Sequence, residues 1–152
     1  MIDAMLYLDA ELAADDLASL AQDRRRWRGS RRVGISGPSG DGELAVWRGD
    51  MHQVMLRLIR PGVYGDFLLS DECLPGEFAG PPPYRPRSIL VLHVSTSPAK
   101  NAEIGLRLAI ELAADCARRW PCRLTNDAIG GGRRIYTRDE IIEAERKGEL
   151  LE

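Results

Sequence analysis

The groups in this chain best suited to chemistry are two histidines and three cysteines. His52 and His93 lie neither in an H-x-x-x-H pair nor beside a cysteine at ligand spacing, which gives a zinc site little support. Cys73, Cys116 and Cys122 include no C-x-x-C pair, and an odd number of separated thiols is typical of a reducing compartment. We therefore expect structural thiols and no metal centre.

Activated nucleophiles and phosphate cradles are not indicated either. No G-x-S-x-G segment is present, and a serine or cysteine nucleophile needs a base held within reach. The glycine-rich segment 37–42 fits neither common phosphate-binding pattern and is better explained as a hairpin turn. Residues 95–97 could hold an anion through backbone N–H groups, but helix capping explains the same residues without a ligand and is preferred. These patterns predict a protein that is not an enzyme and uses no cofactor.

Composition is that of a globular protein. The chain has 152 residues, of which 44% are hydrophobic and 29% charged, so we expect one domain over residues 1–152. A net charge of -2 provides no general attraction to nucleic acid or anionic lipid. The longest mainly apolar stretch, 104–114, is too short to span a bilayer, and the first residues do not resemble a signal peptide. We expect a cytoplasmic protein without a membrane partner.

Periodicity in the first half predicts strands around one helix. Apolar and polar residues alternate over 2–8, as in a half-buried strand, and helical spacing follows up to about residue 21. Asp9 is placed to cap that helix. Short strands are expected at about 31–36, 43–48 and 52–60. Residues 61–87 contain six of the nine prolines and should form a long Pro/Gly-rich loop.

The second half contains the clearest elements. Residues 88–95 are apolar on both sides, which predicts a central strand covered on both faces. A helix is expected at 99–119, with Ile104, Leu108, Leu112 and Cys116 facing inward, and then a short strand at 122–125. Thr137 and Glu140 form a capping box for a last helix. The fold class expected is α+β: a two-layer sandwich with a mostly antiparallel sheet of five to six strands, two main helices on one face and a short C-terminal helix.

One face of this sheet is the best candidate binding surface. If the even-numbered residues of strands 2–8 and 52–60 face the helices, the odd-numbered residues face away from them. Tyr7, Met55 and Arg57 then share that face, and Trp47 is a candidate from the neighbouring strand. Aromatic residues, methionine and arginine are enriched in protein interfaces, so we interpret these four as partner-binding residues. Alternatively, the 61–87 loop or the C-terminal helix folds over this face.

Two other function classes use different features. An RNA-binding domain could hold phosphates with the arginines of segment 24–32, but there is no RNP1-like string, aromatic residues make up 6%, and the pI is 5.8. Nucleic acid is therefore disfavoured as a partner. A regulatory domain could bind a small ligand in a cleft between the helices and the 61–87 loop.

Residues 88–142 also resemble small bacterial immunity proteins, which neutralise polymorphic or secretion-system toxins. The resemblance is carried by segments 88–92, 106–120, 122–127 and 134–140, in that order. It implies a cytosolic protein that binds a cognate toxin or effector directly and has no catalytic residues. Such pairs often match opposite charges, so Asp15 and Asp16 are further candidate partner-binding residues that could meet a basic cleft. The arginines of segment 24–32 could instead meet an acidic cleft, and the sequence does not choose between the two. A homodimer is left open.

Overall fold

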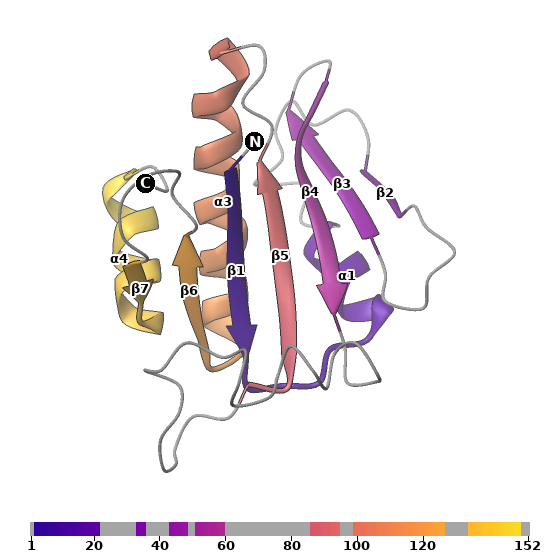
Figure 1. Cartoon of the computed structure of the whole chain (residues 1–152), viewed down its shortest axis with the longest axis vertical. Helices are drawn as coiled ribbons and strands as arrows, with labels where there is room; N and C mark the ends of the chain where they lie inside the picture. Colours follow the sequence, from indigo (N-terminus) through magenta and orange to yellow (C-terminus); the bar gives the residue numbers. More distant parts are fainter. Residues whose placement is uncertain are drawn as a thin grey trace.

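The computed structural model describes residues 2–21, 33–35, 43–48, 51–59, 86–94, 99–126 and 134–149. These residues form an α+β fold in which one antiparallel sheet has its strands in the order β2-β3-β4-β5-β1-β6-β7 (Figure 1). The strands are β1 (Ile2–Leu8), β2 (Val33–Ile35), β3 (Glu43–Arg48), β4 (Met51–Ile59), β5 (Ser88–Val94), β6 (Cys122–Asn126) and β7 (Arg134–Tyr136). The helices in these ranges are α1 (Ala14–Ala21), α3 (Ala99–Arg119) and α4 (Arg138–Lys147). The expected fold class is confirmed.

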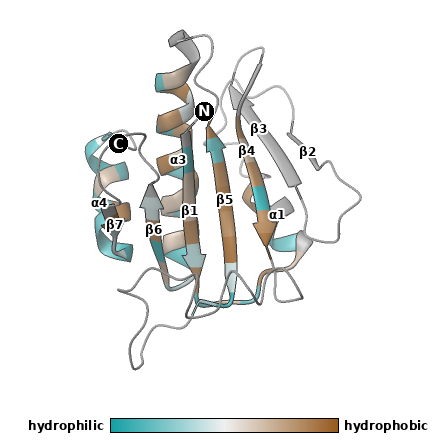
Figure 2. Ribbon diagram, viewed as in Figure 1, coloured by the Kyte–Doolittle hydropathy of each residue, from teal (hydrophilic) through white to brown (hydrophobic). Residues whose placement is uncertain are grey.

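The central strand is β5, as its apolar sequence predicts. It pairs with β4 on one side and β1 on the other, and six of its seven residues are buried. Figure 2 shows this strand as hydrophobic along most of its length. The terminal strand β7 was not expected, because three residues are too few to show an alternating pattern. It joins the sheet through β6, where Tyr136 lies opposite Leu124.

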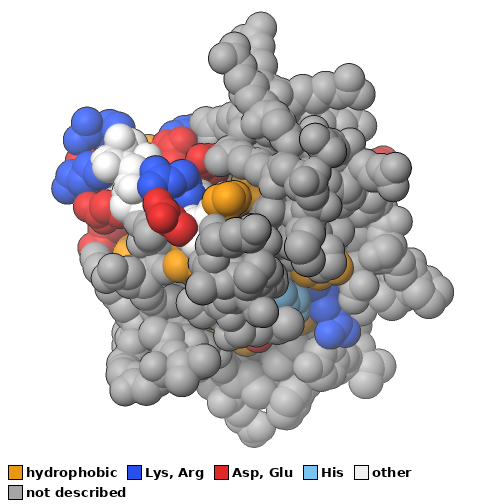
Figure 3. Space-filling model, turned by 90° about the horizontal axis from the view of Figure 1, so that it is seen from above, with side chains coloured by type: hydrophobic (Ala, Val, Ile, Leu, Met, Phe, Trp, Pro, Cys, Tyr) orange, Lys and Arg blue, Asp and Glu red, His pale blue; other side chains and the backbone are white. Residues whose placement is uncertain are grey.

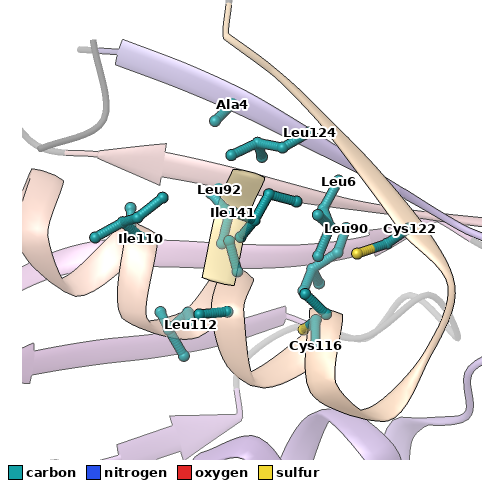
Figure 4. Close-up of a cluster of buried hydrophobic side chains, with 14 of the residues drawn as sticks. Ala4, Leu6, Leu90, Leu92, Ile110, Leu112, Cys116, Cys122, Leu124 and Ile141 are labelled. Carbon is teal, nitrogen blue, oxygen red and sulfur yellow. The ribbon is translucent and has the colours of Figure 1, made fainter. Parts of the chain in front are cut away.

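The main core lies between the sheet and the helices, which cover the same face (Figure 1). As the parity of β1 and β4 predicts, Leu6 and Leu56 are fully buried against this layer. Figure 4 shows Leu112 and Cys116 of α3 and Ile141 of α4 in one cluster with Leu6 and Leu92 of the strands. None of the described helices is both long and apolar enough to cross a membrane.

The inward stripe expected on α3 is wrong at its first member. Leu108, Leu112 and Cys116 are buried, but Ile104 is 39% exposed. In Figure 1 the first turns of α3 extend past the ends of β1, β5 and β6, so these strands offer that part of the helix little to pack against. Helical spacing identifies a face of the helix but cannot say how far along the helix its partner reaches.

A buried serine organises the connection from β1 to α1. The Ser88 hydroxyl donates to the Ala10 carbonyl oxygen at 2.7 Å and accepts from the Leu12 N–H at 3.0 Å. Asp9 does not cap the helix as expected. Its backbone N–H donates to the Pro121 carbonyl and its carboxylate pairs with Arg87, so it fixes the end of β1 instead.

Helix α4 has caps at both ends. The Thr137 N–H donates to Glu140 Oε2 at 2.8 Å, and the Glu140 N–H donates to Thr137 Oγ1 at 3.4 Å, which confirms the expected capping box. Gly148 ends the helix with φ 69°, a left-handed conformation that favours glycine. Ile141 and Ala144 anchor α4 in the core beside α3.

Candidate binding face of the sheet

The face of the sheet opposite α1, α3 and α4, hereafter the distal face, carries a second apolar cluster. Its buried members are Tyr7, Ile59, Ile89 and Val91, with Met5 and Ile135 partly buried against them. Strand register arranges the distal face in three rows across β4, β5 and β1. Each row has one residue from β4, one from β5 and one from β1, in that order. The first row is Ile59, Ile89 and Tyr7, the second is Arg57, Val91 and Met5, and the third is Met55, His93 and Asp3. Side chains at such directly opposed positions are close neighbours.

The solvent exposure of the side chains differs from one row to the next. The row that contains Tyr7 is buried, and Tyr7 itself is 4% exposed, which leaves a partner little of it to contact. Met55, Arg57 and Met5 are half-buried in the rows beyond it. The candidate surface is therefore the end of the distal face that these three residues share with His93 and Asp3.

Arg57 is the least satisfied polar side chain on this surface. It lies opposite Val91 on β5 and, through the backbone register, opposite Glu43 on β3. Its Nε atom is buried, and no acceptor among the described residues reaches it. A buried donor without an acceptor costs about 1–3 kcal/mol, so Arg57 is the side chain of this face whose hydrogen bonding the fold satisfies least.

Asp3 and His93 form the polar end of the same face. His93 Nδ1 lies 2.8 Å from Asp3 Oδ1, and their side chains are 29% and 41% exposed. A carboxylate only accepts hydrogen bonds, so the pair places a proton on Nδ1 and leaves Nε2 for another partner. Figure 3 shows basic and acidic side chains intermingled over the part of the surface formed by α4.

This pair was missed by the sequence analysis, which considered His93 only as a possible zinc ligand. The two residues are 90 positions apart, and no local motif connects them. The alternation of side chains along β1 and β5 places both residues on the distal face. Only the register of β1 against β5 brings them opposite each other. In the described part of the chain, no hydroxyl or thiol is hydrogen-bonded to the His93 ring, and no group of three potential metal ligands is found.

The remaining candidates lie elsewhere. Trp47 is on β3, where a register shift after Val46 places it opposite His52, and its side chain is outside the described part. Asp15 is exposed on α1, in the helix layer rather than on the distal face. Asp16 is half-buried, and its Oδ2 accepts from the Ala13 N–H at 2.7 Å, which gives it a role in holding the start of α1.

The sequence left open that the C-terminal helix or the 61–87 loop folds over the distal face. The C-terminal helix does not cover it, because α4 packs against α3 and β6 on the other side of the sheet. Of the expected 61–87 loop, only Pro86 and Arg87 are described, and the rest lies outside the described residues, as does the arginine-rich segment 24–32.

Cys116 and Cys122 are buried in the main core, where the expectation of structural thiols is confirmed for both. Burial raises the pKa of the Cys122 thiol to about 12, although Arg138 opposes the shift. Burial raises the pKa of Cys116 further, and the neighbouring Cys122 and Asp115 add to this effect. Both groups therefore stay protonated and are poor nucleophiles at neutral pH. Cys73 lies outside the described residues.

Comparison with known proteins adds no assignment. No protein-family model, curated protein or solved structure matches this chain.

Proposed function

We propose that this chain is a non-catalytic protein-binding domain that docks a partner protein through the accessible end of the distal face. The observation that carries the proposal is the position of Met5, Met55 and Arg57, which are half-buried beside the buried Val91. Methionine adapts its shape to a partner, and arginine is among the residues whose truncation costs most in interfaces. Partly exposed residues of these types next to an apolar cluster are suited to form the centre of an interface.

The partner that we propose is a cognate bacterial toxin or effector, which would make the chain a cytoplasmic immunity protein. This step rests on the resemblance over residues 88–142. The order of β5, α3, β6 and α4 supports it, since the resemblance implies a strand, a long helix, a short strand and a capped tail. Immunity proteins act by binding, so the proposal needs no catalytic group in the chain.

The experiment co-expresses the chain with the product of the neighbouring open reading frame. It measures rescue of growth and the affinity of the purified pair. Met55→Asp places a charge within the proposed contact and should weaken binding by about 30-fold or more, with loss of rescue. Ile104→Asp is the matched control, because it alters an exposed hydrophobic side chain on α3 instead.

Thermal melting of both variants separates loss of contact from loss of folding. Equal affinities for wild type, Met55→Asp and Ile104→Asp would contradict the proposed surface. Absence of any complex or rescue would contradict the proposed partner. A steep fall in affinity for RNA with salt, or stabilisation by a small ligand, would instead favour the RNA-binding or ligand-binding alternative.

A further inference from the structure

The Asp3–His93 pair offers two hydrogen-bond acceptors at the accessible end of the distal face. Nδ1 of His93 is occupied by Asp3 Oδ1 at 2.8 Å, and Nε2 makes no hydrogen bond within the described part of the chain. Unlike Arg57 Nε, Nε2 is not a buried atom, so a group from outside can reach it. The same holds for Asp3 Oδ2, because the Asp3 side chain is 41% exposed.

The position of the ring proton determines which partner groups fit this pair. Because a carboxylate only accepts hydrogen bonds, the neutral ring carries its proton on Nδ1 and has a lone pair at Nε2. Asp3 adds one negative charge beside that lone pair. A positively charged donor matches both features, whereas a carboxylate or a phosphate matches neither.

We infer that the Asp3–His93 pair receives a lysine of the partner protein, whose ammonium group donates to His93 Nε2 and is attracted by the Asp3 carboxylate. This inference rests on the proposed function and adds the chemistry of the partner. The ammonium has three donors on a flexible stem, so it can contact acceptors on two different side chains. The planar fork of a guanidinium is instead matched to both oxygens of one carboxylate, and here Asp3 Oδ1 already holds the His93 ring.

Arg57 is the described positive charge nearest to this pair in the strand register. It lies diagonal to His93, one row away, whereas Asp3 is directly opposite His93 and in contact with it. The Coulomb energy falls as two charges move apart, so Asp3 outweighs Arg57 for a cation at Nε2. Of these three side chains, histidine is the type that ordinarily changes its charge between pH 5 and 8.

The charge state of the ring provides the first test. Protonation places a hydrogen on Nε2, which removes the acceptor and adds a positive charge beside the lysine. The probe is the purified product of the neighbouring open reading frame. Its affinity for the chain should fall by about three- to tenfold between pH 8 and pH 5.5. The fall should begin at the pH where the carbon-bound ring protons of His93 titrate by NMR, and an affinity that rises at low pH would overturn the inference.

Two substitutions of His93 isolate the contribution of Nε2. His93→Asn keeps an amide donor near the position of Nδ1 but reaches no further, so the affinity at pH 8 should fall about tenfold. His93→Gln places an amide oxygen near the position of Nε2, so most of the affinity at pH 8 should remain while its pH dependence is lost. Melting temperatures check that both variants fold. Equal affinities for wild type, His93→Asn and His93→Gln at both pH values would overturn the inference.

The negative charge is tested separately. Asp3→Asn should weaken binding by about three- to tenfold at low salt and less at high salt, because it removes the charge that attracts the ammonium group. Asp15→Asn is the matched control, since Asp15 is exposed on α1, away from the distal face. Equal losses of affinity in the two variants would contradict a specific role of Asp3.

The partner side of the contact is tested by changing its lysines to methionine one at a time. One of these changes should be non-additive with His93→Asn in a double-mutant cycle. If the complex forms but neither His93→Asn nor Asp3→Asn alters its affinity, the inference fails and the proposed function stands. A neutral ring with its proton on Nε2, read from nitrogen-15 shifts, would also overturn the inference alone. If no complex forms, the proposed function fails and the inference fails with it.

Discussion

His93 Nδ1 lies 2.8 Å from Asp3 Oδ1, across the pairing of the central strand β5 with β1. The contact joins residues from opposite halves of the chain on the distal face, next to the row that holds Arg57. It orients the imidazole ring and directs Nε2 away from Asp3. The Asp3 contact therefore fixes the orientation of the His93 ring independently of any partner.

We expect the Asp3–His93 contact to set the tautomer of the ring. With Asp3 ionised, the neutral ring should carry its proton on Nδ1, because the carboxylate can only accept. Asp3→Ala removes that acceptor, and the proton should move mainly to Nε2, the tautomer that free imidazole side chains favour. Nitrogen-15 shifts of the His93 ring measure the change. Asp15→Ala is the control, and a tautomer that is the same in Asp3→Ala and wild type would contradict the assignment.

Ser88→Ala should destabilise the fold by about 2–3 kcal/mol, measured as the free energy of unfolding in urea. The substitution leaves the Leu12 N–H without its acceptor and the Ala10 carbonyl without its donor in a buried place. Ser19→Ala is the matched control, because that hydroxyl is exposed and water can replace its hydrogen bonds. Its effect should stay within about 0.5 kcal/mol. Similar losses of unfolding free energy in Ser88→Ala and Ser19→Ala would show that burial does not strengthen the contribution of the Ser88 hydroxyl to stability.

The adjacent acids Asp15 and Asp16 should behave differently. Asp16→Ala removes the acceptor of the Ala13 N–H and should cost about 1 kcal/mol of unfolding free energy. Asp15→Ala alters an exposed side chain and should be close to neutral. Affinity for the partner is measured in parallel. If Asp16→Ala left stability unchanged but weakened partner binding, the structural role assigned to Asp16 would be wrong.

The buried thiols predict a loss of stability in alkali. Because burial raises the pKa of Cys116 and Cys122, both stay protonated in the folded chain, while thiols in the unfolded chain ionise near their ordinary pKa of 9.0. Their contribution is fully present below pH 9 and falls as the pH rises from 9 towards 12. Each thiol should cost up to about 1.4 kcal/mol per pH unit in that window.

The measurement is the free energy of unfolding at pH 8 and pH 10, under reducing conditions. The variant Cys116→Ala/Cys122→Ala should be less stable than wild type at pH 8, since it leaves space in the core. It should nevertheless lose less stability on going to pH 10. Parallel pH dependence in the two proteins would mean that the thiols ionise equally in both states.

Local patterns in the sequence determined the elements and the faces of the strands. Alternation over 2–8 and an apolar run from residue 88 predicted β1 and β5, and Thr137 and Glu140 predicted the start of α4. These features depend on neighbours within about four residues, so a linear sequence contains them. The same alternation placed Met55 and Arg57 together on the distal face.

Only the tertiary structure decided which strands became neighbours and in what register. Placing β1 between β5 and β6 aligned Asp3 with His93, and the reach of the sheet left Ile104 exposed. The tertiary structure also buried Tyr7, while it left Arg57 only half-buried. Register and burial arise from packing between distant segments, whose free energy is shared among many contacts and leaves no local signature in the sequence.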